Sequence, residues 1–331
     1  MAKIGNIDLG EFPLLLAPME DVSDPPFRAL CKENGADVVY TEFISSEGLI
    51  RNAAKSTMKL DIYEQERPVG IQIFGANLDS MLQSVDIVER TNPDIIDINF
   101  GCPVKKVVCK GAGAGILKDI DKMEMLTREM VKRTKLPVTV KTRLGWDEKS
   151  IKIVEVAERI HAAGAKAITI HGRTRAQMYK GFADWAPISE VKNNSRMTIP
   201  VFGNGDVNSP EKAIEMRDRY GLDGAMIGRA SIGNPWFFNH VKHYFKTGEH
   251  LPYPMIDERI DMAKRHLEMS IKWKGEKLGV LETRRHYSNY FKGIPDFKKH
   301  RTKMVTCDYA AQLFDLFEEL KIRFKNKELA Y

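Results

Sequence analysis

Long apolar runs are missing from this sequence of 331 residues. No stretch of about 18 uncharged apolar residues occurs, which excludes a helix that crosses a membrane. The opening residues, MAKIGNIDLGEF, contain no apolar core, so a secretory signal peptide is not expected either. We therefore expect a cytoplasmic protein with no membrane partner.

Cysteine is also scarce. The four cysteines are Cys31, Cys102, Cys109 and Cys307. None forms a CxxC pair and no histidine cluster has the spacing of zinc ligands, so no metal site is predicted. In a reducing compartment these residues are expected to be free thiols.

The composition is that of an ordinary globular chain, with 43% hydrophobic, 29% charged and 9% aromatic residues. The net charge of +6 is concentrated in one segment. Residues 284–303 contain seven Lys or Arg side chains and a single acid, Asp296, with aromatic residues interleaved. Such a segment is typical of a surface that binds a polyphosphate backbone, although a solvated helix face has the same pattern.

Short apolar runs alternate with amphipathic stretches over roughly the first 230 residues, close to the usual size of a barrel domain. Stretches such as Asp79–Arg90 and Ile151–Ala163 are predicted helices. The predicted strands are Leu14–Ala17, Val38–Thr41, Val69–Phe74, Ile95–Phe100, Val138–Thr142, Ala167–His171, Pro200–Gly203 and Ala225–Gly228. Eight such units predict a (β/α)8 TIM barrel, with an open doubly wound sheet as the alternative.

The pattern changes after Arg229, where no further strand is predicted. A linker is expected at Gly248–Pro254. Helices are predicted at Asn234–Tyr244, Ile256–Lys274, Leu281–Phe291 and Tyr309–Lys325. We therefore predict a barrel domain of residues 1–247, followed by a small all-α helical domain of residues 248–331 that contains the basic segment.

Functional side chains of a barrel lie at the C-terminal ends of its strands. Alternation along the strands places a polar set inside that end: Gln72, Asn99, Lys141, Arg143 and His171. Lys141 is the most costly of these to bury, and it needs a carboxylate, a phosphate or an electron-rich ligand as its partner. A salt bridge to Asp97 is the purely structural alternative.

Glycine-rich turns follow the last two predicted strands. They read Gly203-Asn204-Gly205-Asp206 and Gly228-Arg229-Ala230. Barrels often bind a phosphate with these two loops, through backbone N–H groups and a charge-assisted contact of the kind that Arg229 offers. We therefore predict a phosphate-bearing cofactor. The run Gly111–Gly115 lacks the spacing of a dinucleotide fingerprint and is expected to be a mobile loop.

Cys102 follows the fourth strand, in the run Asn99-Phe-Gly-Cys102-Pro103. A thiol in this loop can act on a molecule bound in the barrel mouth, as a nucleophile or as a proton donor. An incidental small loop residue is the alternative. Cys31 falls in a predicted helix and is expected to be buried in the core.

Taken together, these motifs resemble the tRNA-dihydrouridine synthases, most closely the bacterial B-type branch of that family. The resemblance covers about residues 12–325. Glu20 departs from it, because many relatives have a small residue there. The motifs that carry it are Ala17-Pro-Met19, Asp24-Pro-Pro-Phe-Arg28, Gln72-Ile-Phe-Gly75, Asn99-Phe-Gly-Cys102-Pro-Val-Lys-Lys-Val, Lys141-Thr-Arg143, His171-Gly-Arg-Thr174, Asn204-Gly-Asp206 and Gly228-Arg229.

The resemblance implies an FMN-binding barrel followed by a helical tRNA-binding domain. Such an enzyme reduces the C5–C6 double bond of a uridine in the tRNA D-loop to 5,6-dihydrouridine. NADPH or NADH reduces the FMN, and Cys102 matches the residue that donates a proton to C5. The residues assigned to the cofactor are Pro18, Met19, Glu20, Gln72, Lys141, His171, Asn204, Gly205, Asp206, Gly228 and Arg229.

The expected partner is tRNA. Its predicted contacts are Asn99 and Arg173 in the barrel, and Arg284, Arg285, Lys298 and Lys299 in the basic segment. No protein partner is implied, and a monomer is expected. A flavin barrel that reduces a free small molecule would explain the cofactor residues but not the basic segment. A non-enzymatic RNA-binding protein would leave Cys102, Lys141 and Arg229 unexplained.

Overall fold

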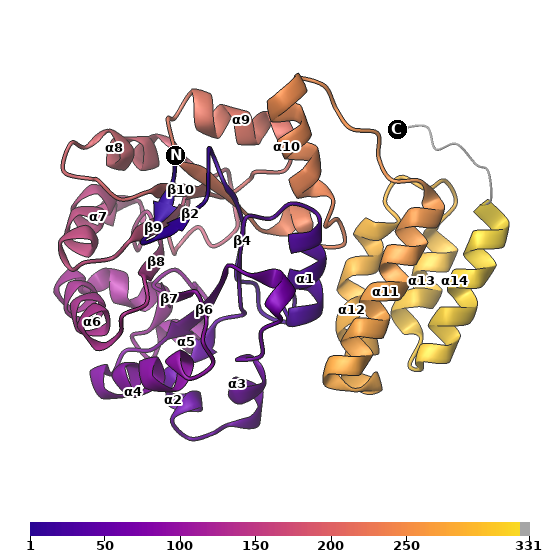
Figure 1. Cartoon of the computed structure of the whole chain (residues 1–331), viewed down its shortest axis with the longest axis horizontal. Helices are drawn as coiled ribbons and strands as arrows, with labels where there is room; N and C mark the ends of the chain where they lie inside the picture. Colours follow the sequence, from indigo (N-terminus) through magenta and orange to yellow (C-terminus); the bar gives the residue numbers. More distant parts are fainter. Residues whose placement is uncertain (325–331) are drawn as a thin grey trace. The chain divides into compact units, whose positions relative to one another are not determined.

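Eight parallel strands form the centre of the computed structural model, which describes residues 1–324 (Figure 1). In chain order they are β3 (Leu14–Leu16), β4 (Val38–Tyr40), β6 (Val69–Phe74), β7 (Ile95–Asn99), β8 (Val138–Arg143), β9 (Ala167–His171), β10 (Val201–Asn204) and β11 (Gly224–Ile227). Neighbours pair in the order β4-β3-β11-β10-β9-β8-β7-β6, and a pairing of β4 with β6 closes the ring. The predicted TIM barrel and its eight strands are confirmed.

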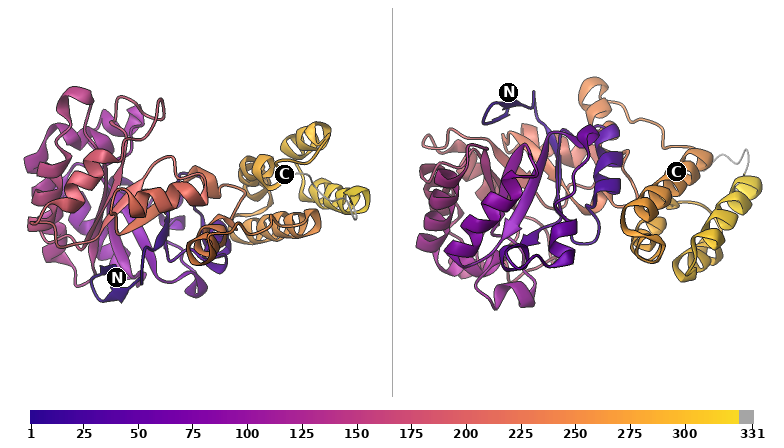
Figure 2. Two further views of the ribbon diagram at one scale, coloured as in Figure 1. Left: turned by 90° about the horizontal axis from the view of Figure 1, so that it is seen from above. Right: turned by 60° about the horizontal axis from the view of Figure 1, so that its bottom comes forward.

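Helices surround these strands, as Figure 2 shows from two further directions. The longer ones are α1 (Pro25–Glu33), α4 (Leu78–Glu89), α6 (Ile120–Arg133), α7 (Ile153–Ala162), α8 (Ala186–Asn193) and α9 (Pro210–Asp218). Helices α1, α4, α6 and α9 each begin at a side chain that accepts an N–H of the first turn. These caps are Asp24, Asn77, Asp119 and Ser209.

Short elements occupy several of the loops between strands and helices. They are β5 (Ile44–Ser45), α2 (Ser46–Leu49), α3 (Ala54–Met58), α5 (Lys105–Val108) and the 3-10 turns η1 (Glu64–Glu66), η2 (Gly113–Lys118) and η3 (Glu148–Ser150). An N-terminal hairpin, β1 (Lys3–Ile4) antiparallel to β2 (Ile7–Asp8), was not predicted. Its two-residue strands are too short to show a periodic pattern.

The interior of the barrel is apolar near the N-terminal ends of the strands. Leu15, Val38 and Phe202 belong to one buried cluster there, and the N-terminal hairpin contributes Ile4 to the same cluster. Farther along the strands the inward-facing residues are polar. Gln72 of β6 pairs with Asp97 of β7, and Asp97 pairs with Thr139 of β8. The barrel interior therefore changes from apolar to polar along the strands, and Asn99, Lys141 and Asn204 bring polar groups to their C-terminal ends.

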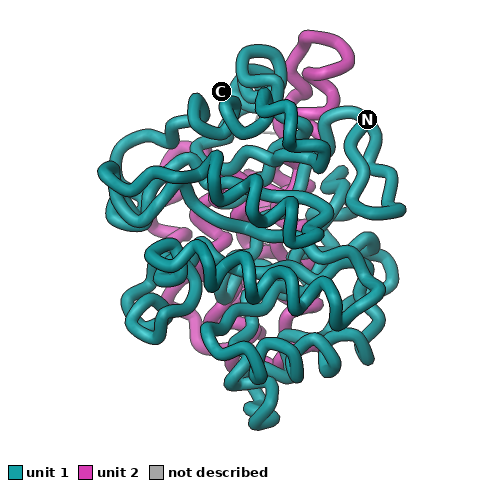
Figure 3. Tube along the Cα trace, turned by 90° about the vertical axis from the view of Figure 1, so that its left-hand side faces the viewer, with its two compact units in different colours: residues 1–228 teal, residues 229–331 magenta. Residues whose placement is uncertain are grey.

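The chain divides into two compact units, residues 1–228 and 229–331, drawn in teal and magenta in Figure 3. Residues 229–324 of the second unit form helices and no strand, which confirms the predicted all-α region. Its elements are η4 (Arg229–Ser231), α10 (Phe237–Thr247), α11 (Ile256–Lys274), α12 (Glu276–Tyr290), α13 (Lys298–Thr306) and α14 (Ala310–Phe324). Helix α10 thus groups with the second unit. The predicted boundary between a catalytic domain that ends at residue 247 and a tRNA-binding domain that begins at residue 248 stays a prediction.

Helix α13 was missed by the sequence analysis. Only His300 and Met304 of this helix are buried, so it has no continuous apolar stripe to read. The core of the helical unit is a single apolar cluster that includes Leu267, Tyr287 and Phe317. Lys325, the end of the last predicted helix, lies outside the described residues. No helix within residues 1–324 is long and apolar enough to span a membrane.

A fully buried ion pair holds α1 to the turn before β6. The Arg28 Nε and Nη2 atoms donate to the two carboxylate oxygens of Glu66 at 2.8 and 2.9 Å, and the side chains are 1% and 0% exposed.

We expect Arg28→Met to lower the free energy of unfolding by about 3–5 kcal/mol, because it leaves the Glu66 charge buried alone. Urea denaturation measures this change. The double variant Arg28→Met/Glu66→Met should recover most of the loss, and a single variant as stable as the parent would contradict the prediction.

Candidate active site

A chain of hydrogen bonds crosses the barrel interior at the C-terminal ends of β6, β7 and β8. Asn99 Nδ2 donates to Gln72 Oε1 at 2.8 Å, and Gln72 Nε2 donates to Asp97 Oδ2 at 2.6 Å. The Thr139 hydroxyl donates to the other Asp97 oxygen. Burial raises the pKa of Asp97 to about 6, although both of these donors favour its ionised form. The carboxylate thereby fixes the orientation of the Gln72 amide.

Lys141 lies beside this chain with a neutral partner. Its Nζ donates to Asn204 Oδ1 at 3.1 Å. Burial, followed by the nearby Arg143 charge, lowers the pKa of Lys141 to about 8. Within residues 1–324 no ion pair joins Lys141 to Asp97, so the structural alternative to a ligand-binding lysine is not realised. An amine desolvated without a carboxylate partner fits an electron-rich ligand in the barrel mouth.

Cys102 lies in the loop after β7 and is held there by Asn99. The side-chain oxygen of Asn99 accepts from the backbone N–H groups of Gly101 at 3.0 Å and Cys102 at 2.8 Å. The thiol is buried, and this burial raises its pKa above the ordinary value. The thiol is therefore protonated at neutral pH, which suits a proton donor better than a nucleophile.

The predicted mobility of the glycine run after Cys102 stays a prediction, but the run is not irregular throughout. Its second half forms η2, and Ala114 N donates to the Cys102 carbonyl at 3.0 Å. A Cβ on Gly113 would lie 2.9 Å from that carbonyl oxygen, and Gly113 has φ +53°. The glycine is thus required for the close packing that supports Cys102 from behind.

Arg143 links the Cys102 loop to the loop after β9. Its Nε donates to the Gly101 carbonyl at 2.8 Å. Its Nη1 donates to the carbonyl groups of Thr174 and Met178 at 3.1 and 2.9 Å. One buried guanidinium therefore fixes two of the loops that border the barrel mouth.

Arg173 is engaged by the protein itself. Its Nη2 pairs with Asp206 Oδ2 at 2.7 Å and donates to the Gly181 carbonyl at 2.6 Å. Its Nη1 lies 3.4 Å from His171 Nε2. Gly205, with φ +111°, leaves room for that imidazole, because a Cβ would approach His171 Cδ2 to 2.7 Å. Arg173 therefore orients His171 and the loop after β9, and its predicted contact with substrate stays a prediction.

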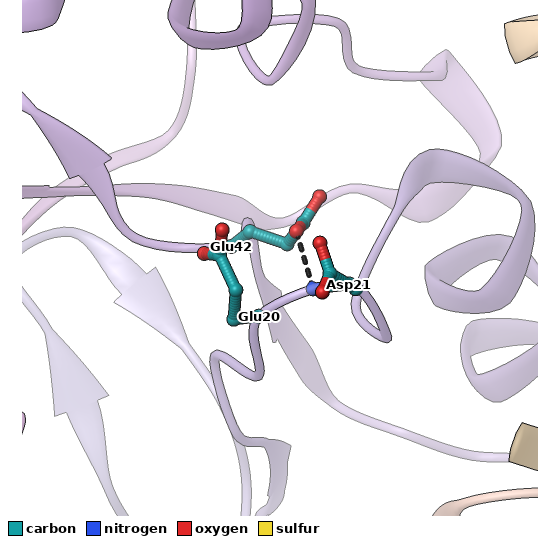
Figure 4. A group of neighbouring side chains, drawn as sticks. All are labelled: Glu20, Asp21 and Glu42. Atoms are coloured by element: carbon teal, nitrogen blue, oxygen red, sulfur yellow. Dashed lines mark hydrogen bonds between the residues drawn. The ribbon is translucent and has the colours of Figure 1, made fainter. Parts of the chain in front are cut away.

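Three acidic side chains meet near the C-terminal ends of β3 and β4: Glu20, Asp21 and Glu42 (Figure 4). The Glu42 carboxylate accepts from Asp21 N at 2.6 Å. Lys59 Nζ pairs with Glu20 at 2.6 Å and Glu42 at 3.3 Å, and Lys55 pairs with Glu20 and Asp21. The Glu20 side chain is therefore committed to an ion-pair network, which leaves its backbone for the predicted cofactor contact.

Two side chains of the predicted phosphate loops already have partners within the barrel unit, and the phosphate contact stays a prediction. The Asn204 amide donates to the Met226 carbonyl at 2.7 Å, and Asp206 accepts from Ala183 N at 2.7 Å. Both side chains are thus used inside the barrel unit. A Cβ on Gly228 would meet only ordinary van der Waals contacts with Ala17 and Met19. Arg229 follows directly in the chain as the first residue of η4.

Comparison with known proteins identifies the family. A sequence profile described as dihydrouridine synthase matches residues 15–326. The chain belongs to the dihydrouridine synthase family. It is 39% identical over 290 residues to tRNA-dihydrouridine synthase B of Pseudomonas putida, covering 88% of this chain and 86% of that one. It is 37% identical to the probable tRNA-dihydrouridine synthase of Rickettsia bellii, covering 91% and 92%. The predicted resemblance is confirmed.

Solved structures agree on the fold of this dihydrouridine synthase family member. Histamine dehydrogenase from Rhizobium sp. 4-9 matches with a TM-score of 0.54 at 14% identity, over 81% of this chain and 50% of that chain. A 2-naphthoyl-CoA reductase also matches with a TM-score of 0.54, at 11% identity, over 73% of this chain and 51% of its own. At such identities the match supports the barrel fold and nothing further.

The basic segment of this family member divides into two kinds of cation. Arg284 Nη2 donates to the Cys307 carbonyl and pairs with Asp308 at 2.9 Å, so this guanidinium ties α12 to the connection between α13 and α14. Arg285, Lys298 and Lys299 are exposed. In the described chain neither Lys298 nor Lys299 forms an ion pair, so these two keep their charges for a ligand.

Lys141 offers a test of the site in the ligand-free protein. Its pKa of about 8 lies below the value near 10.5 of an unfolded chain, so the unfolded state binds more protons between these pH values and stability rises with pH. We expect Lys141→Met to raise the unfolding free energy by about 1–3 kcal/mol at pH 7, and this gain to shrink above pH 8. Urea denaturation at pH 7 to 10 measures it. The exposed Lys135→Met should show no such trend, and a pH-independent effect at position 141 would contradict the assignment.

Proposed function

We propose that this chain reduces the C5–C6 double bond of a uridine in the D-loop of tRNA to 5,6-dihydrouridine. FMN is the proposed cofactor, and NADPH or NADH the proposed reductant. The observation that carries the proposal is Cys102, a protonated and rigidly held thiol at the mouth of a barrel whose interior also presents Lys141. Membership of the dihydrouridine synthase family and the names of the curated relatives support the substrate.

The cofactor would be held by two groups of residues. Gln72 and Lys141 would meet the ring, with Pro18, Met19 and Glu20 contributing backbone groups and His171 standing beside them. Asn204, Gly205, Asp206, Gly228 and Arg229 would hold the phosphate, largely through backbone N–H groups and one guanidinium. Bound FMN, once reduced, supplies the hydride that is added to C6 of uracil. A cation such as Lys141 stabilises negative charge on a reduced ring, which accounts for its costly burial.

Cys102 completes the reaction by donating its thiol proton. Addition of hydride at C6 leaves negative charge that extends to C5 and the neighbouring carbonyl of the base. Protonation of C5 by the Cys102 Sγ–H then gives dihydrouridine, and the thiolate is reprotonated from solvent. Asn99 aims the thiol through its two backbone hydrogen bonds. Asn99 and Arg173 are the proposed contacts of the target nucleotide.

The substrate base is stacked in folded tRNA, so it must leave its stack to enter the barrel mouth. The exposed cations Arg285, Lys298 and Lys299 supply a surface for the sugar–phosphate backbone elsewhere on the same tRNA. This surface favours tRNA over a free small molecule as the substrate. Arg284 acts within the helical unit and supports this surface indirectly.

The direct test is anaerobic. The flavoprotein is reduced with NADPH, mixed with tRNA transcript that lacks modifications, and followed by flavin absorbance. We expect reoxidation by tRNA and none by free uridine, together with dihydrouridine in the recovered RNA. Reoxidation by free uridine at the same rate would reject tRNA as the specific substrate, and a purified protein without flavin would reject the proposal as a whole.

Replacement of the thiol tests the proton donor. Cys102→Ala should lower dihydrouridine formation at least about 100-fold, because a positioned general acid contributes that much or more. The flavin should still bind and still be reduced by NADPH. Cys109→Ala is the matched control, since Cys109 is an exposed free thiol nearby in the sequence. Full activity of the Cys102 variant would reject its role.

Charge removal tests the tRNA surface. Lys298→Ala/Lys299→Ala should weaken tRNA binding and lower the slope of log affinity against log salt by about 2, one unit for each lost phosphate contact. Fluorescence anisotropy of labelled tRNA at several salt concentrations measures both. Lys272→Ala/Lys277→Ala removes two exposed lysines from the same unit and should leave the slope nearly unchanged. Equal effects of the two pairs would contradict a specific surface.

A further inference from the structure

Three successive loops at the C-terminal end of the barrel bring two cations and one indole together. Lys118 ends η2, in the segment that follows β7 and Cys102. Trp146 lies in the loop after β8, and Arg175 lies in the loop after β9. Since β7, β8 and β9 are neighbours in the barrel, their loops share one part of its rim. None of these three residues takes part in the reaction described above.

Both cations lie against the same ring. Lys118 Nζ is 3.8 Å from the centroid of the Trp146 ring, and Arg175 Cζ is 4.6 Å from it. The backbone holds this arrangement in place, because Arg175 N donates to the Gly145 carbonyl and Ala176 N to the Trp146 carbonyl, each at 2.9 Å. The indole is thus a fixed platform that positions two positive charges at the rim.

These charges have no anionic partner within the described chain: neither Lys118 nor Arg175 forms an ion pair in residues 1–324. The acids closest in sequence are used elsewhere, because Asp119 caps α6 and Asp147 caps η3. The Nε atom of Arg175 is buried and has no hydrogen-bond partner. Two like charges on one ring, with an unused buried donor, form an arrangement that an arriving anion would stabilise.

We propose that Lys118, Trp146 and Arg175 form a phosphate-binding rim that receives the sugar–phosphate backbone of the RNA beside the nucleotide in the barrel mouth. This inference rests on the proposed function, and it assigns a contact to the barrel rather than to the basic helical surface. A polyanionic backbone fits better than a single small anion, because its successive phosphates can meet separate cations. Only Lys118 is exposed, while Trp146 and Arg175 are half-buried, which suits a contact that fixes position.

The same loop carries a second feature that suits RNA. After Arg175 it presents Met178, Tyr179 and Phe182, which are 41%, 56% and 89% exposed. Unstacked nucleobases pack on aromatic side chains of this kind, next to cations that follow the backbone. Exposed aromatic residues beside unpaired cations are the combination expected for a single-stranded or locally opened RNA segment.

The test compares two double variants in the full-length flavoprotein. Lys118→Gln/Arg175→Gln keeps the side-chain stems and removes both charges from the rim. Lys135→Gln/Lys166→Gln removes two exposed charges at the starts of β8 and β9, the opposite end of the same strands. We expect the rim pair to raise the KM for tRNA about tenfold at low salt, with kcat changing far less, and to lower the salt slope by about 1 to 2. The control pair should do neither.

Tryptophan fluorescence provides a readout that is independent of turnover. Binding of tRNA should change the emission of the parent protein, and Trp146→Phe should remove most of that change. Equal KM effects from the two double variants, or no effect from the rim pair, would overturn the proposal. A raised KM for NADPH with an unchanged KM for tRNA would overturn it in favour of a site for the phosphates of the reductant. If the parent protein forms no dihydrouridine at all, the proposed function fails, and the fluorescence response to tRNA still decides whether the rim binds RNA.

Discussion

The constraint on which this structure depends is that a closed barrel buries its polar strand ends, and every buried polar group needs a partner. Two short hydrogen-bond relays provide these partners in the barrel interior: Asn99–Gln72–Asp97 and Lys141–Asn204–Met226. Each relay joins residues of different strands, so the side chains cannot turn independently. Lys141 donates to a neutral amide and has no ion pair in the described chain, which is why we propose it as a contact of the cofactor.

The loop that carries Cys102 is held in part by a side chain that also belongs to one of these hydrogen-bond relays. Asn99 serves both the first relay and the backbone of the Cys102 loop, so one side chain positions both the thiol and Gln72. Arg143 extends the connection to the loop after β9, and Gly113 allows η2 to pack behind the thiol. These contacts fix the direction of the thiol, and burial keeps it protonated at neutral pH, as the proposed role of Cys102 as a proton donor requires.

Positive charge in this protein serves two separate purposes. Some cations stabilise the fold through an ion pair within one unit. These pairs are Arg28–Glu66, Arg173–Asp206 and Arg284–Asp308. Others, such as Lys298 on α13 and Lys118 on the rim, have no acidic partner in the described chain. Only the second group can neutralise an external anion without first breaking an ion pair. The partners of each cation, rather than the number of cations, therefore separate the structural ones from those that we propose as RNA contacts.

The eight strands, the all-α region that follows them and the family could be predicted from the sequence, because each depends on local periodicity or a local motif. The same holds for the strand-end residues Gln72, Asn99, Lys141 and His171. It could not show α13, whose few buried residues leave no stripe, nor the N-terminal hairpin. The three-dimensional structure was needed to show that Arg284 and Arg173 are engaged within the protein and that Lys141 lacks an ion pair with Asp97. It also revealed that Lys118, Trp146 and Arg175 meet. Those outcomes depend on distances between residues far apart in the chain, which no local pattern records.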